Sequence, residues 1–167
     1  MERKMYHTQE RRTIRLTSPV LCERSDAWLG NAYYFWDDIV DAERWGDKSK
    51  KRTGSFEIYA SQITVDNFLD TVFNEDHYLF YKKQIEKVSK TIEKKARRKA
   101  SIKDIAAYIN EKAWLGNLDG ILFQDLPIGY HELIPDYPYR KRIQAAVYNI
   151  DCVLSFIFIK DEKCITI

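Results

Sequence analysis

The sequence predicts a single α+β domain built on a mostly antiparallel sheet. Segments typical of strands come first and last in the chain, while segments typical of helices gather in the middle, an order that differs from the βαβ alternation of parallel sheets. The 167 residues suffice for one domain with a buried core. Aromatic residues make up 14% of the chain, a content that suits a sheet core, a site that stacks on a planar ligand, or both.

The first third of the chain predicts three strands and a helix. The run AYYFW at 32–36 is typical of a strand because aromatic side chains favour pleated surfaces. Asp37 and Asp38 then offer N-cap chemistry, and a helix is expected to run from them to Gly46. Two shorter strands are expected upstream, MYHT at 5–8 and TIRLT at 13–17.

The middle of the chain predicts one strand and three helices. Residues 78–98 carry apolar side chains on one helical face and Lys on the others, the pattern of an amphipathic helix. Ser101 offers a cap for the helix after it. The expected elements are a strand at 55–61 and helices at 65–73, 78–98 and 102–114.

The last third of the chain returns to strands. DGILFQDLP at 119–127 is expected to be a strand after a turn, and PDYPY at 135–139 a loop braced by prolines. The tail from residue 142 to 167 is expected to hold two or three strands.

The pentapeptide AWLGN occurs twice, at 27–31 and at 113–117. The first copy precedes the aromatic strand, whereas the second ends a predicted helix, and the similarity does not extend to either flank. A structural repeat would span a whole supersecondary unit. We interpret the two copies as separate uses of one short element, in which Trp-Leu anchors and Gly-Asn turns.

The N-terminus and the cysteines point to a reduced, cytoplasmic setting. MERKMYHTQERR lacks the apolar run of a signal peptide, and no run of about 18 apolar residues suggests a membrane span. We therefore expect a cytoplasmic protein with no membrane partner. The chain has three cysteines, an odd number without CxxC spacing, which disfavours a disulfide framework, a zinc site and a catalytic thiol: Cys22, Cys152 and Cys164.

Charge is strongly polarised along the chain. Residues 82–103 contain ten Lys and Arg against Glu86 and Glu93, a local charge of +8, so that the remaining chain carries about −6 of the total of +2. Such a segment favours an acidic partner such as nucleic acid or an acidic protein. The alternative is a solvated helix face with no partner.

Three segments together resemble the ADP-ribosyltransferase superfamily: YHT at 6–8, LGNAYYFWDD at 29–38 and RIQAAVYNID at 142–151. The resemblance is to the branch with a His-Tyr-Glu triad, which includes the poly(ADP-ribose) polymerases and diphtheria-like toxins. It implies that His7, Tyr34 and Gln144 stand at the triad positions, with Gln in place of Glu. It also implies a split sheet around an NAD cleft, formed by one domain over 1–167 with a helical insertion at about 77–115.

The same resemblance implies how NAD would be held. The nicotinamide would lie between Tyr34 and an aromatic residue on the next helix, and Trp45 follows Tyr34 by about three helical turns. His7 would hydrogen-bond a ribose, and backbone groups at Thr8 and Gly30 would line the NAD site. No metal is implied. Gln144 would orient the ribose and the acceptor, with a weaker hydrogen bond than a carboxylate gives.

The function expected from this resemblance is mono-ADP-ribosyl transfer from NAD to a macromolecular acceptor, protein or nucleic acid, by a microbial toxin or defence effector with a possible antitoxin partner. Chain extension is not expected because Gln144 replaces the Glu. Two alternatives use the same fold. One is a catalytically silent module that binds ADP-ribose or nucleic acid, and the other is an NAD glycohydrolase that uses water as acceptor.

Overall fold

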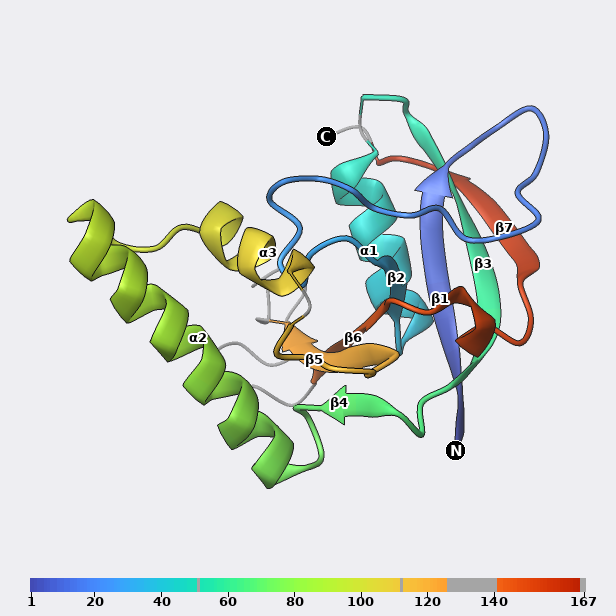
Figure 1. Ribbon diagram of the computed structural model, residues 1–167. Helices are drawn as coiled ribbons and strands as arrows, with labels where there is room; N and C mark the ends of the chain where they lie inside the picture. Colours follow the sequence, from blue (N-terminus) through green and yellow to red (C-terminus); the bar gives the residue numbers. More distant parts are fainter. Residues whose placement is uncertain (51, 112, 126–140, 166–167) are drawn as a thin grey trace.

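A computed structural model describes residues 1–50, 52–111, 113–125 and 141–165. The described part of the chain forms a seven-stranded sheet and three α-helices (Figure 1). The strand order is β4-β5-β6-β2-β1-β3-β7, and each neighbouring pair is antiparallel except the parallel pair β4–β5. The α+β class and the mostly antiparallel sheet predicted from the sequence are therefore confirmed.

Most of the predicted elements are present. The strands are β1 Glu2–Glu10, β2 Tyr33–Trp36, β3 Ser55–Thr64, β4 Phe68–Asp70, β5 Gly120–Asp125, β6 Arg142–Val147 and β7 Ile157–Lys163. The helices are α1 Ile39–Ser49, α2 Glu75–Ala96 and α3 Ile102–Asn110, with a 3₁₀ turn at Ile150–Cys152. The predicted caps are confirmed: Asp38 accepts a hydrogen bond from the Val40 N–H at the start of α1, and Ser101 forms a capping box with Asp104 on α3.

The sheet is joined unevenly at its centre. On one side, β1 pairs with β3 along its whole length, from Glu2 opposite Thr64 to Glu10 opposite Phe56. On the other side, β1 pairs with β2 through Tyr6 and Trp36 alone among the described residues. Because so little ladder joins β1 to β2, contacts other than strand pairing must hold these two strands together.

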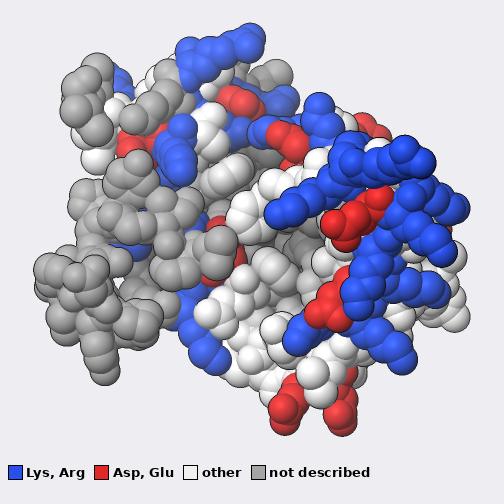
Figure 2. All heavy atoms as spheres, turned by 90° about the vertical axis from the view of Figure 1, so that its left-hand side faces the viewer, with Lys and Arg blue, Asp and Glu red and all other residues white. Residues whose placement is uncertain are grey.

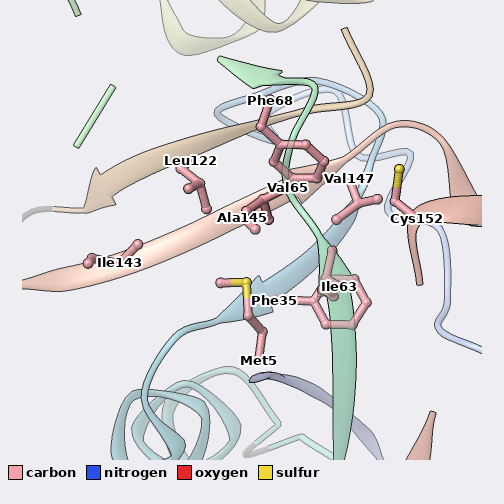
Figure 3. Packing of buried hydrophobic residues seen from close by; sticks show 10 residues of the cluster. All are labelled: Met5, Phe35, Ile63, Val65, Phe68, Leu122, Ile143, Ala145, Val147 and Cys152. Carbon is pink, nitrogen blue, oxygen red and sulfur yellow. The ribbon is translucent and has the colours of Figure 1, made fainter. Parts of the chain in front are cut away.

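The two faces of the sheet carry different cores. We call them the Met5 face and the Trp36 face. The Met5 face bears the cluster drawn in Figure 3, whose ten buried members are Met5, Phe35, Ile63, Val65, Phe68, Leu122, Ile143, Ala145, Val147 and Cys152. On the Trp36 face, Ala42 of α1 packs with Trp36, and Ile109 of α3 packs with Ala146 of β6. Two helices therefore cover different parts of the Trp36 face, α1 over Trp36 of β2 and α3 over Ala146 of the neighbouring β6.

The two AWLGN copies form similar local turns and meet in one cluster. Leu29 and Leu115 are both buried in the core cluster beneath α3. Gly30 and Gly116, the next residues, have φ values of 73° and 59°. This left-handed conformation favours glycine. The pentapeptide thus recurs as an anchoring leucine followed by a glycine turn, and no larger unit repeats around it. The tryptophan of the first copy does not anchor as expected, because Trp28 is 43% exposed.

Two predicted elements are wrong. TIRLT at 13–17 is not a strand: both edges of β1 are occupied by β2 and β3, which leaves no adjacent place for it. Residues 65–73 do not form a helix. Phe68 and Leu69 are buried, and β4 pairs there with β5. The Asp70 carboxylate then accepts hydrogen bonds from the N–H groups of two following residues, which closes a turn.

Helix boundaries also differ from the predictions. Helix α1 continues past Gly46 to Ser49, and α3 ends at Asn110 before the second AWLGN copy. Gly46 is buried where α1 packs on β3, and a Cβ at this position would overlap the Phe56 ring. It is therefore a packing glycine and not a helix terminator. The predicted loop at 135–139 lies outside the described residues.

We expect Gly46→Ala to destabilise the fold by about 1–3 kcal/mol because the added methyl group overpacks the α1–β3 contact. Helix propensity alone predicts the opposite sign, a gain of up to about 1 kcal/mol. Urea unfolding measures the difference, with Ser49→Ala, an exposed change on the same helix, as the control. A stabilised Gly46→Ala protein would show that the helix is free to move away from Phe56.

Candidate functional site

The three strands that bear the predicted triad positions are direct neighbours, in the order β6-β2-β1. Their side chains divide between the two faces. Trp36 lies opposite Tyr6 on β1 and Gln144 on β6, so these three side chains share the Trp36 face. Tyr34 shares that face because strand side chains alternate, whereas His7 lies on the Met5 face. The strands therefore bring Tyr34 and Gln144 to one side of the sheet and His7 to the other.

His7 is a buried tie between β1 and β2. Its side chain is 3% exposed, and Nδ1 lies 2.8 Å from the Tyr34 carbonyl oxygen. Nε2 accepts a hydrogen bond from the Val20 N–H at 3.3 Å. These partners fix the neutral tautomer with the proton on Nδ1, which donates to Tyr34. Burial among Phe35, Phe156 and other groups lowers the pKa of His7 to about 4.

Thr8, the next residue, makes the corresponding tie on the Trp36 face. Its hydroxyl donates to the Ala42 carbonyl oxygen of α1 at 2.9 Å and is buried. His7 and Thr8 thus connect β1 to β2 and to α1 respectively. These are the two elements that carry Tyr34 and Trp45.

Tyr34 and Gly30, both predicted at the site, are in direct contact. The Tyr34 hydroxyl donates to the Gly30 carbonyl oxygen at 2.7 Å and accepts from the Leu29 N–H at 3.1 Å. Burial raises the pKa of Tyr34, which keeps the hydroxyl protonated as a donor. A side chain at Gly30 would overlap the Asn110 amide oxygen of α3. Tyr34 therefore anchors the loop before β2 beneath α3.

The ring contact of Trp45 is with Trp36. Their ring centroids are 6.0 Å apart at 47°. Trp36 is 2% exposed, whereas Trp45 is 37% exposed and so offers ring surface to a ligand. Trp36 also lies opposite Gln144 on β6, so it neighbours both Trp45 and the strand position of the amide. The sequence interpretation paired Trp45 with Tyr34 and did not identify Trp36.

Gln144 is half-buried in a row of side chains across the sheet. Trp36 of β2 lies opposite it on one side, and Phe123 of β5 lies opposite it on the other. An amide between two aromatic side chains can hydrogen-bond a ligand while the rings exclude water from that bond.

A buried ionic cluster next to Gln144 was not identified from the sequence. Arg142 is 7% exposed. Its Nε lies 3.4 Å from an Asp41 carboxylate oxygen, and its terminal nitrogen Nη1 lies 3.3 Å from an Asp125 carboxylate oxygen. Its guanidinium carbon lies 4.8 Å from the Trp36 ring centroid. Strand alternation could have placed Arg142 on the face of Gln144. Nothing in the helical pattern of DDIVDAERWG marks Asp41 as fully buried.

The Trp36 face thus combines one exposed aromatic ring, one amide and a guanidinium held by two carboxylates. Such a surface suits a planar ring that carries hydrogen-bonding groups. The part of the chain that the structure describes contains no group of three His, Cys, Asp or Glu side chains suited to a metal ion. No described helix is both long and apolar enough to cross a bilayer.

Comparisons of the chain with protein-family models, with curated proteins and with solved structures give no match.

The stability of the fold should fall as the pH decreases from about 6.5 to 4. The pKa of His7 is near 6.5 in the unfolded chain and about 4 when folded, so the unfolded state binds more protons in this window. A lowering of this size corresponds to about 3 kcal/mol of unfolding free energy. Urea unfolding at pH 7, 5.5 and 4 measures it.

The comparison variants are His7→Gln and His77→Gln. The part of the pH dependence that comes from His7 should disappear in His7→Gln and persist in His77→Gln, because His77 lies on α2, away from the β1–β2 junction. An equal pH dependence in both variants would mean that His7 takes up a proton in the folded protein as readily as in the unfolded one.

Proposed function

We propose that this protein is a mono-ADP-ribosyltransferase that transfers ADP-ribose from NAD to a macromolecular acceptor. The observation that carries the proposal is the strand order β6-β2-β1, since the three segments that resemble the superfamily become adjacent strands although they are far apart in sequence. Helix α1, which bears Trp45, follows β2 directly and packs on the same face as Gln144.

In the proposed site, the nicotinamide ring of NAD lies against Trp45 on the Trp36 face. Stacking suits this ring because Trp45 is partly exposed and its ring packs on that of Trp36. Tyr34 contributes by fixing the Leu29–Gly30 loop with its hydroxyl. The Gln144 side chain accepts a hydrogen bond from a ribose hydroxyl through its amide oxygen or donates one to it through its amide nitrogen.

The reaction needs no proton transfer to the leaving group. The bond between the ribose carbon and the nicotinamide nitrogen breaks, the electron pair leaves with the nitrogen, and neutral nicotinamide departs. The ribose carbon becomes positively charged, and a nucleophile of the acceptor bonds to it and loses its proton to solvent. The protein contributes mainly orientation and electrostatic stabilisation.

In this proposal His7 acts as a positioning residue. Its Nδ1–H holds the Tyr34 carbonyl group, and through it the start of β2, in place. A direct contact between His7 and a ribose hydroxyl requires Nε2 to release the Val20 N–H, and that hydrogen bond is the longer of the two at 3.3 Å. Positioning through Tyr34 requires no such change.

A catalytically silent binding module is the second candidate, and Gln144 favours it. A carboxylate hydrogen-bonds more strongly than an amide and stabilises positive charge on the ribose, whereas Gln144 supplies a neutral hydrogen bond only. NAD hydrolysis is a third outcome of the same site, in which water takes the place of the acceptor.

The test is incubation of the purified protein with NAD labelled in its adenylate phosphate and a cell lysate separated into protein and nucleic-acid fractions. We expect label in one fraction. Trp45→Ala should lower the labelling by about 5- to 160-fold, because an aromatic stacking contact contributes about 1–3 kcal/mol. Trp28→Ala is the matched control, since Trp28 is 43% exposed and lies in the loop before β2.

The product distinguishes the candidates. Free ADP-ribose without labelled acceptor would indicate hydrolysis. Intact NAD together with thermal stabilisation by NAD, absent from Trp45→Ala, would indicate the silent module. Intact NAD with no thermal shift would contradict the transferase, the hydrolase and a silent module that binds NAD.

A further inference from the structure

Helix α2 projects from the body of the molecule with one face packed and the rest in solvent (Figure 1). The packed side bears Tyr81, whose ring meets Trp114 and Phe123, and Gln84, which accepts a hydrogen bond from the Tyr108 hydroxyl of α3 at 3.1 Å. Further half-buried residues follow at helical spacing on this side: Ile85, Val88 and Ile92. None of the 22 residues of the helix is fully buried.

The opposite side of α2 carries four lysines in a row. Lys83, Lys87, Lys90 and Lys94 follow one another at intervals of four, three and four residues, so they lie on a single face of the helix. At 100° per residue this face is directly opposite the one that bears Tyr81, Ile85 and Ile92. All four side chains are exposed, and Figure 2 shows the Lys and Arg side chains gathered along this part of the molecule. We call these four residues the lysine row.

Within the described part of the chain, the lysine row outnumbers the carboxylates beside it on α2, Glu86 and Glu93. None of the four forms an ion pair there, whereas Lys82, on the flank of the helix, lies 3.9 Å from Glu86. Like charges at three- and four-residue spacing destabilise a helix. The helix dipole favours cations only in the last turn, so it explains Lys94 but not Lys83 or Lys87.

We propose that the lysine row is a binding surface for the phosphate backbone of a nucleic acid. The row spans about 16 Å along the helix, and its evenly spaced point charges match a polymer with one negative charge per repeat. The rest of the chain carries about −6 against +8 for residues 82–103, so the protein's field turns α2 toward a polyanion. We further infer that the bound nucleic acid is the acceptor of ADP-ribose, a step that rests on the proposed transferase activity.

An anionic membrane fits the same helix less well. Helices that bind membranes insert their apolar face beneath the headgroups. The apolar face of α2 is instead packed against α3 and the side chains of Trp114 and Phe123. The exposed apolar side chains of α2, Tyr78, Leu79 and Phe80, lie in its first two turns, before the lysine row. Along the row itself the free side is charged, which suits a partner that is charged throughout.

The binding experiment is fluorescence anisotropy with a fluorescein-labelled single-stranded DNA of about 20 nucleotides over a range of NaCl concentrations. It compares the wild-type protein with the quadruple variant K83Q/K87Q/K90Q/K94Q. The control variant K4Q/R52Q/K141Q/K163Q also loses four exposed cations, none of them on α2. Circular dichroism establishes that both variants are folded.

We expect the lysine-row variant to bind at least tenfold more weakly at about 0.1 M salt, and the slope of log K against log salt to decrease by about 3, since each phosphate contact contributes about 0.7 for a single strand. The control variant should change the slope by less than about 1. Equal losses in both variants, or no saturable binding by the wild type, would overturn the proposal.

Competition experiments exclude the other polyanions. Displacement of the DNA by polyglutamate as readily as by unlabelled DNA would overturn the proposal in favour of an acidic protein partner. Binding to phosphatidylserine vesicles that DNA does not displace would overturn it in favour of a membrane surface. All DNA binding is measured without NAD, so a failure to bind DNA does not contradict the transferase proposal. Conversely, we expect Trp45→Ala to lose labelling and to bind DNA as tightly as the wild type.

Discussion

The hydrogen bond from His7 Nδ1 to the Tyr34 carbonyl oxygen is the buried polar contact that joins the two halves of the sheet, beside the Arg3–Asp37 ion pair and the packing of Met5 with Phe35. At this junction the ladder between β1 and β2 contains a single residue pair among the described residues, Tyr6 with Trp36. A buried hydrogen bond in a low-dielectric setting is strong and costly to break without replacement. The neutral ring fits both partners, because Nδ1–H donates to Tyr34 while Nε2 accepts from the Val20 N–H, and burial favours this form by lowering the pKa of the ring to about 4.

Several features of the Trp36 face depend on this junction although His7 lies on the other side of the sheet. Its bond fixes the backbone at Tyr34, and the Tyr34 hydroxyl in turn holds the Leu29–Gly30 loop. Two residues further along β2, Trp36 meets Trp45 of α1 and the Arg142 guanidinium of β6. The side chains at the candidate site therefore come from both halves of the sheet, and their relative positions follow from how β1 and β2 are joined.

Local sequence signals predicted the elements around the site, whereas the contacts between the elements needed the structure. The aromatic run before Asp38 predicted β2 and the cap of α1, because both depend on neighbouring residues. Gly46 was wrongly predicted to end the helix. The residue that requires a glycine there is Phe56, which lies on β3 and is distant in sequence. The same holds for Asp41. Its place in the helical pattern suggests an exposed residue, and its burial follows from the contact with Arg142 of β6, which is distant in sequence.

The ionic cluster gives a physical reason why an amide is compatible with position 144. Arg142 and Gln144 share a face of β6, and Arg142 already interacts with Asp41 and Asp125. Arg44 also lies 4.0 Å from Asp41, so two guanidinium groups already face two carboxylates. A carboxylate at 144 would add a third negative charge to this cluster, in a place where Trp36 and Phe123 limit solvation. An amide adds hydrogen-bonding capacity without this cost. The carboxylates on the Trp36 face are thus paired with guanidinium groups, whereas the lysine row forms no ion pair among the described residues. The surface suited to a planar ring and the surface suited to a polyanion are therefore separate parts of the molecule.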